Sequence, residues 1–219
     1  MSVSFNLYEV AQNYLSRILS TDSDNAESGQ LTRKENSSDH IRILLLDNVT
    51  SKVISMVSTQ SELLKHEIFL IDRLENTERD NLKNLPCICL LRPSDLTVSN
   101  LCNEISAPKY KSYQVYFNNI VSKPRLERLA ESDDMEIVSK VAEVFQDFYT
   151  INKTFFTSIN IQNSLCINLP DTWAGPSFDS SLDSIVSTLL SLKLNPVIRY
   201  ASNSKLRHKL ASPVAYRIK

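Results

Sequence analysis

The 219-residue sequence contains only two glycines, Gly29 and Gly175, and they lie far apart. Walker-type phosphate loops and dinucleotide-binding fingerprints need several glycines within a few residues, because the backbone must approach the phosphates closely. Neither motif can occur here. The commonest classes of nucleotide-binding enzyme are therefore excluded.

The sequence also lacks an excess of charge and any long apolar run. Its 24 basic and 25 acidic residues give a formal net charge of −1, which provides no long-range attraction for nucleic acid or acidic lipid. The first residues, MSVSFNLYEV, do not form a basic segment followed by an apolar one, and no stretch approaches the length of a membrane span. We therefore expect a cytosolic protein with no nucleic-acid partner and no segment inserted in a membrane.

The sequence also lacks the CxxC pairs that are typical of metal-binding and redox-active cysteines. The first two cysteines alternate along an apolar run, which is typical of buried thiols in a reducing compartment. The three histidines lie far apart in the sequence, so no base is placed beside a nucleophile and no ligand cluster is apparent. We expect neither catalysis nor a bound metal or cofactor. The cysteines are Cys87, Cys89, Cys102 and Cys166.

The sequence does contain a regular alternation of apolar and amphipathic segments. The run IRILLLD is apolar on both faces, which is typical of a strand inside a parallel sheet. Strands that alternate with helices predict a three-layer α/β domain with a five-stranded parallel sheet. Helical patterns occur at 6–19, at 94–105 with Ser94 as the N-cap, and at 180–194. The strands are predicted at 41–47, 67–74, 87–93, 112–119 and 144–151.

The composition changes at two places along the chain. Residues 20–40 carry almost no large apolar side chains, which predicts a mobile polar linker. After residue 151 the sequence is rich in Ser, Asn and Pro and contains too few elements to bury a second core. We therefore divide the chain into a first α/β domain, 1–151, and the incomplete start of a second α/β domain, 152–219.

The segment VSKPRLERLAESDDMEIVSK, residues 121–140, combines charge with a narrow apolar stripe. A helix is predicted to begin at Pro124, and a second short helix at Ser132 or Asp133. Leu126, Leu129 and Ala130 share one side of the first helix. They face either the core, as a helix in an α/β domain requires, or a partner.

The ends of the predicted strands offer an alternative function. Ligands of parallel α/β sheets usually bind at the carboxyl ends of the strands, so a small-molecule or phosphate-binding domain is a second hypothesis. A phosphoacceptor domain is excluded, because Asp47 has no acidic neighbour and the third strand ends in Arg92-Pro93 without an aspartate. The other strand ends are Asp72-Arg73 and Asn118-Asn119.

Several long runs resemble the SM family, the syntaxin-binding proteins of intracellular membrane fusion, and particularly its endosomal branch. The resemblance covers nearly all of the chain from residue 5 onward, apart from the linker. It implies a three-domain arch, of which this chain holds the five-stranded first domain and the first part of a discontinuous second one. The implied function is non-enzymatic regulation of SNARE-mediated fusion, through a syntaxin-type SNARE of the trans-Golgi or endosome. The clearest runs are TQSELLKHEIFL, CICLLRPSDLTVSN and NIVSKPRLERLAESDD.

The resemblance also implies a binding pocket on the first domain for the N-terminal peptide of a syntaxin. A buried apolar anchor can dominate a small peptide interface of this kind. Lys52 and Asp72 are candidates for a second surface, the inner cleft of the arch. The pocket residues implied by the resemblance are Leu126, Leu129 and Ala130 on one wall, Val138, Ala142 and Phe145 on the other, and Glu143 as an acidic contact.

Overall fold

The structure, a computed structural model, describes residues 6–20, 41–159, 175–203 and 205–218. Contacts within the chain divide it into two compact units, one of residues 12–144 and one of residues 1–11 with 145–219. The assignment of 1–151 and 152–219 to two domains stays a prediction. The predicted linker lies, except for Ser20, outside the described residues.

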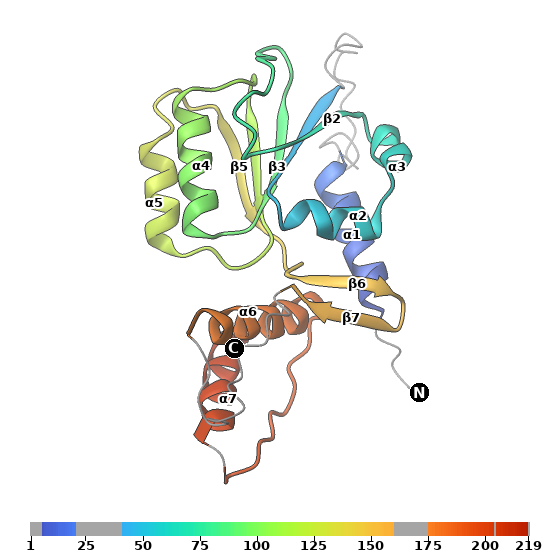
Figure 1. The fold of residues 1–219 in the computed structure, drawn as a ribbon, viewed down its shortest axis with the longest axis vertical. Helices are drawn as coiled ribbons and strands as arrows, with labels where there is room; N and C mark the ends of the chain where they lie inside the picture. The colour runs from blue at the N-terminus through green and yellow to red at the C-terminus, as the bar shows by residue number, and fades with distance from the viewer. Residues whose placement is uncertain (1–5, 21–40, 160–174, 204, 219) are drawn as a thin grey trace, which may run out of the picture. The chain divides into compact units, whose positions relative to one another are not determined.

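The unit of residues 12–144 is built on a five-stranded parallel sheet in the order β2-β1-β3-β4-β5 (Figure 1). Every residue of β1 and β3 is buried, as the apolar runs ILLL and CICLL predict for central strands. The predicted α/β class is confirmed. The strands are β1 (Arg42–Leu46), β2 (Ile68–Arg73), β3 (Cys87–Leu91), β4 (Tyr113–Phe117) and β5 (Val138–Glu143).

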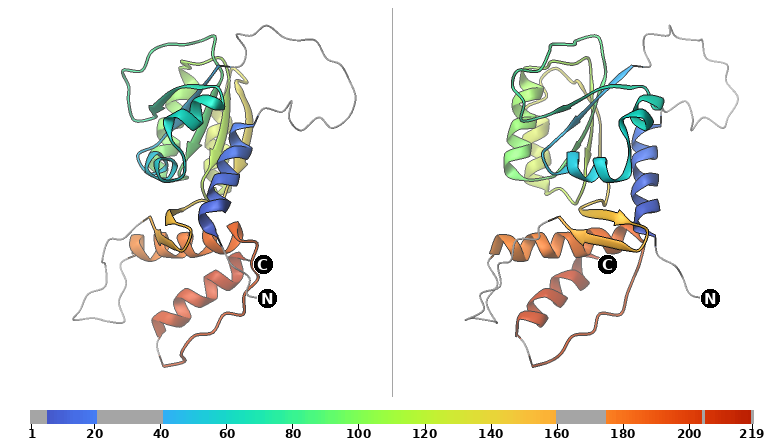
Figure 2. Two further views of the ribbon diagram at one scale, coloured as in Figure 1. Left: turned by 90° about the vertical axis from the view of Figure 1, so that its right-hand side faces the viewer. Right: turned by 45° about the vertical axis from the view of Figure 1, so that its right-hand side comes forward.

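Helices cover both faces of this sheet, with α4 and α5 side by side on one face (Figures 1 and 2). On the opposite face α1 lies against α2, where Gln12 Nε2 donates to the Val57 carbonyl at 3.4 Å. The predicted N-cap of α4 is confirmed, since the Ser94 side chain accepts the Thr97 N–H. The helices are α1 (Leu7–Leu19), α2 (Thr50–Val57), α3 (Gln60–Lys65), α4 (Asp95–Ser106) and α5 (Lys123–Glu131).

The core between the sheet and α4/α5 follows from strand alternation. Tyr113, Val115 and Phe117 of β4 point into it together with Leu101 of α4 and Leu129 of α5. Because successive side chains point to opposite faces, the intervening residues of β4 face α1 instead. Alternation therefore decides on which surface each residue near the sheet edge lies.

The prediction for the fifth strand is wrong in position. The fifth strand is β5, not 144–151, and the chain before it forms a tight turn rather than the second short helix. The Asp133 carboxylate accepts the N–H groups of Ile137 and Val138 at 2.9 and 3.1 Å, and Glu136 has a left-handed φ of 52°. Both features stop a helix and direct the chain into the sheet.

The other unit contains the residues predicted as that strand. β6 (Phe148–Asn152) pairs antiparallel with β7 (Phe155–Ser158). The predicted helix at 180–194 is found as α6 (Gly175–Ser191), and α7 (Lys205–Arg217) follows it. A small core joins the two helices, formed by Phe178, Leu182, Val186 and Val214.

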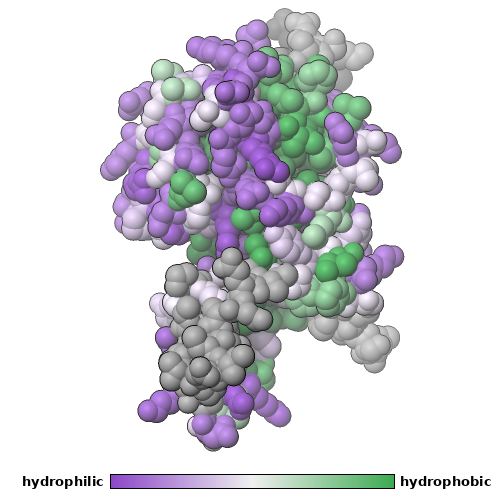
Figure 3. Space-filling model, in the orientation of Figure 1, coloured by the Kyte–Doolittle hydropathy of each residue, from purple (hydrophilic) through white to green (hydrophobic). Residues whose placement is uncertain are grey.

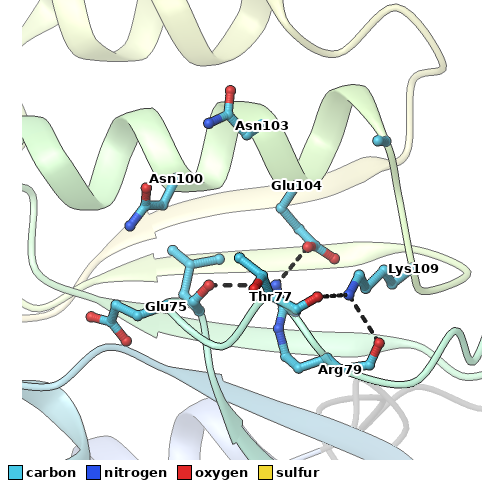
Figure 4. A pocket seen from close by; sticks show the side chains of 9 residues that line it. Glu75, Thr77, Arg79, Asn100, Asn103, Glu104 and Lys109 are labelled. Atoms are coloured by element: carbon cyan, nitrogen blue, oxygen red, sulfur yellow. Dashed lines mark hydrogen bonds and ion pairs between the residues drawn. The ribbon is translucent and has the colours of Figure 1, made fainter.

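A buried ion pair lies beneath the loop that joins β2 to β3. Arg79 donates to Glu104 Oε2 at 2.7 Å, and both side chains are 4% exposed. The Tyr113 hydroxyl donates to Glu104 Oε1 at 2.6 Å, which together with burial raises the pKa of Tyr113 well above its usual range. Figure 4 shows how Lys109 completes the cluster by donating to the carbonyls of Thr77 and Arg79.

Replacement of Glu104 tests the energetic role of this cluster. Glu104→Ala leaves the Arg79 guanidinium buried without its carboxylate, and we expect the free energy of unfolding to fall by about 3–5 kcal/mol. Urea denaturation of the purified chain measures the effect. Asp95→Ala is the matched control, because it breaks the exposed Arg125–Asp95 pair and should change stability little. Equal losses in the two variants would contradict this role.

Candidate functional site

The carboxyl ends of the strands are held by a buried carboxylate. Asp47, 2% exposed, follows β1 directly, and its Oδ1 accepts the N–H groups of Val49 and Thr50 at 2.8 and 2.7 Å. Its Oδ2 accepts the Arg92 N–H at 2.5 Å. The carboxylate thus begins α2 and joins the ends of β1 and β3. Because both oxygens are engaged by backbone donors, this aspartate does not form a ligand site.

The two residues considered for an inner cleft, Lys52 and Asp72, have different roles in the structure. The Asp72 carboxylate accepts its neighbour's backbone N–H at 2.7 Å and the Asn76 amide at 3.2 Å, which shapes the turn after β2. Lys52 is exposed on α2. The geometry gives Asp72 a structural role and leaves the Lys52 ammonium available to a partner.

The helix α5 presents its apolar residues in two directions. Leu129 is 3% exposed and belongs to the core, so for this residue the alternative of packing onto the sheet is correct. Leu126 is 36% exposed, and Ala130 is exposed as well. The surface over α4 and α5 is otherwise mainly hydrophilic (Figure 3). An exposed leucine among charged side chains is the apolar feature that α5 offers to a partner.

Polar contacts fix the orientation of α5. Arg125 Nε donates to Asp95 at 2.9 Å, and an Arg128 terminal nitrogen donates to the Ser99 hydroxyl at 3.0 Å. The Arg125 guanidinium lowers the pKa of the Asp95 carboxyl. Both contacts join α5 to α4, so that Leu129 points inward and Leu126 outward.

The edge strand β5 divides the remaining candidate residues between two faces. Val138 and Glu143 lie opposite Tyr113 and Phe117, which point toward α4 and α5. Ala142 lies opposite Tyr116 and faces α1. Directly opposed residues of neighbouring strands point to the same face. Ala142 therefore cannot share one pocket with Leu126.

The structure adds Val141 to the candidate surface and places Phe145 in the other unit. Val141 lies opposite Val115 and is 43% exposed, so it presents an apolar side chain on the same face as α5. Glu143 is tied to the start of that helix, because its Oε1 accepts the Val121 N–H at 2.8 Å. Phe145 belongs to the other unit. Only the register of β5 could have distinguished Val141 from Ala142.

These residues define what we call the α5/β5 surface: Leu126, Ala130, Val138, Val141 and Glu143. Its exposed apolar side chains, with charged neighbours on α5, suit a short peptide that inserts one apolar residue. In addition, β5 is the last strand of the sheet, and an edge strand offers unpaired backbone groups to an extended chain.

Other chemical features of the described residues are few. Cys87 and Cys89 are buried, as predicted, with their sulfur atoms 3.8 Å apart, and burial raises the pKa of the Cys87 thiol. No group of three or more His, Cys, Asp or Glu in the described ranges is arranged to hold a metal ion. In the same ranges, no helix combines the length and the apolar character needed to cross a bilayer.

Comparison with known proteins identifies relatives along most of the chain. The sequence model of the Sec1 family matches residues 42–219. Vacuolar protein sorting-associated protein 45 of Saccharomyces cerevisiae is 42% identical over 97% of this chain, and the human protein of that name is 36% identical over 82%. The chain spans 36% and 31% of the lengths of these two relatives.

Solved structures show the same likeness. The SM protein Vps45 in complex with the Qa SNARE Tlg2 matches with a TM-score of 0.82 and 38% identity, over 96% of this chain and 35% of that one. A structure of Vps45 by itself gives a TM-score of 0.83 and 37% identity, over 99% and 38%. Sly1p in complex with an N-terminal peptide of Sed5p, at 19% identity and a TM-score of 0.75, shows the fold alone.

The structural role of Asp47 can be tested directly. Asp47→Ala leaves three backbone N–H groups without their acceptor, and we expect the free energy of unfolding to fall by about 2–3 kcal/mol. Asp72→Ala is the control at the end of the neighbouring strand, where the carboxylate is less buried and the loss should be much smaller. Thermal and urea unfolding measure both. Unchanged stability of Asp47→Ala would instead favour a ligand role for this carboxylate.

Proposed function

The chain belongs to the Sec1 family, and from this we propose that it is the N-terminal part of an SM regulator of SNARE-mediated membrane fusion. Its partner is a syntaxin-type SNARE of the trans-Golgi or endosome, and it acts by holding that SNARE rather than by catalysis. Support comes from the relative whose structure contains the Qa SNARE Tlg2. Its place is the cytoplasmic side of Golgi, endosomal or vacuolar membranes, reached through the SNARE.

The α5/β5 surface is the proposed binding site for the N-terminal peptide of the syntaxin. The observation that carries this proposal is the outward position of Leu126, held by a helix whose other leucine is in the core. Leu126 and Val141 contact the apolar anchor of the peptide, and Ala130 leaves space for it. Glu143 of β5 and the exposed acidic residues of α5 attract basic side chains of the peptide, an effect that salt screens.

Lys52 belongs to a second proposed contact with the folded part of the SNARE. Its exposed ammonium on α2 lies on a different element from the peptide site, so the two contacts can form together. Asp72 is left out of this contact because its carboxylate holds the turn after β2. Two separate contacts on one chain raise the overall affinity through effective concentration.

A charge placed on the α5/β5 surface tests the peptide site. Leu126→Arg and Val141→Arg put a guanidinium where the apolar anchor must insert, and we expect each to weaken binding of a syntaxin N-terminal peptide by about a hundredfold. Because both positions are partly exposed, the melting temperature should stay nearly constant. Titration of a fluorescent peptide, together with thermal unfolding, measures the two effects.

Two further variants separate this effect from unfolding and from general charge. Leu129→Arg buries an unpaired charge in the core and should lower the melting temperature strongly. Leu64→Arg changes another exposed leucine, on α3, and should leave peptide binding intact. If Leu126→Arg lowers the melting temperature as much as Leu129→Arg, or leaves peptide binding intact, the proposed site is wrong.

A further inference from the structure

A cavity of about 220 Å³ lies on the face of the sheet opposite the proposed peptide site. It is open to solvent between α1, β4 and the edge strand β5. Holding one water molecule requires about 10–15 Å³ of such volume, so the cavity has room for a group of several heavy atoms. The lining residues are Tyr14, Arg17, Ile18, Tyr116, Lys140, Ala142, Glu143 and Val144.

The polar groups in this cavity are mostly donors without acceptors. Arg17 and Lys140 have no carboxylate partner among the residues that the structure describes. Tyr116 is 5% exposed, yet within the described chain its hydroxyl has no hydrogen-bond partner. The Lys140 Nζ lies 5.4 Å from the centre of the Tyr116 ring. The two cationic side chains and the Tyr116 phenol line one cavity, and their donors can therefore reach a single external acceptor.

Neighbouring groups make the cavity more positive. The buried Arg42 lies close enough to Tyr116 to interact with it electrostatically, and it donates to the carbonyls of Leu19 and His66 at 2.6 and 2.8 Å. Burial raises the pKa of Tyr14, so its phenol remains a proton donor at neutral pH. Glu143 is the one carboxylate in the described lining, and its Oε1 already accepts the Val121 N–H.

We propose that this cavity binds a phosphate monoester. At neutral pH such a group carries between one and two negative charges and three strong acceptor oxygens. Arg17, Lys140 and two phenol hydroxyls supply the matching charge and donors, and charge-assisted hydrogen bonds of this kind are the strong ones. Apart from Glu143, which borders both sites, the cavity lies on a different face of the sheet from the α5/β5 surface, and the proposal does not depend on SNARE binding. The shared ligand chemistry is that of a soluble sugar or inositol phosphate and of a phosphoinositide headgroup.

Isothermal titration of the 219-residue chain with glycerol 2-phosphate and with inositol 1-phosphate tests the proposal. We expect saturable binding to the native chain, weakened about tenfold by Lys140→Ala and about fivefold by Tyr116→Phe. Tyr116→Phe removes only a hydroxyl that bonds to none of the described residues, so its melting temperature should equal that of the native chain. Lys111→Ala removes an exposed lysine near the other end of β4 and should change the affinity by less than about twofold.

Vesicles distinguish the two sources of the phosphate. Co-sedimentation with phosphatidylcholine vesicles containing a phosphatidylinositol monophosphate, lost in Lys140→Ala, identifies a lipid headgroup; binding of the soluble compounds alone identifies a free phosphate monoester. Absence of binding in both assays overturns the proposal. An equal loss in Lys140→Ala and Lys111→Ala also overturns it, because diffuse charge would then account for the binding.

Discussion

The buried carboxylate of Asp47 is the interaction on which the arrangement of the sheet depends. A parallel sheet brings several chain reversals to one edge, and each reversal leaves backbone donors that water cannot reach. One side chain here accepts donors from the start of α2 and from the residue after β3, while Thr50 donates to the Leu90 carbonyl at 2.7 Å. This edge of the sheet is thus closed by protein groups, and the surfaces available to partners lie elsewhere.

Two of the proposed surfaces lie at β5, where the sheet ends. Inside the unit, charged groups satisfy one another, as Arg79 and Glu104 do beside Tyr113. At β5 the pattern changes: one face carries exposed apolar side chains, and the other carries Arg17 and Lys140, which have no carboxylate partner among the described residues. Arg17 and Lys140 are exposed, yet they line one cavity together with two phenols. Such a concentration of donors points to an anionic ligand more strongly than an evenly mixed charged surface does.

The fold class could be predicted from the sequence because four strands are apolar runs separated by clear helix signals. The position of β5 could not be predicted, because its sequence VSKVAE is neither a continuous apolar run nor a regular alternation. The fifth strand was therefore predicted at the more apolar VFQDFYTI. The sequence pattern of α5 likewise did not decide whether Leu126 is exposed or buried. The packing of α5 against α4 determines that Leu126 is exposed. The register of β5 determines that Val141, and not Ala142, lies on the same face of the sheet as α5. Neither depends on local sequence.

The register of β5 contains an irregularity between its pairs with Tyr113 and Gln114, where Ser139 is the additional residue. Shifting a strand by one residue moves every side chain to the other face. Loss of Ser139 would remove the irregularity and keep Val141 opposite Val115 and Ala142 opposite Tyr116, whereas a slip of the whole strand by one residue along β4 would exchange their faces. The irregularity thus gives β5 one residue that divergence can remove without exchanging the α5/β5 surface and the cavity between the two faces of the sheet.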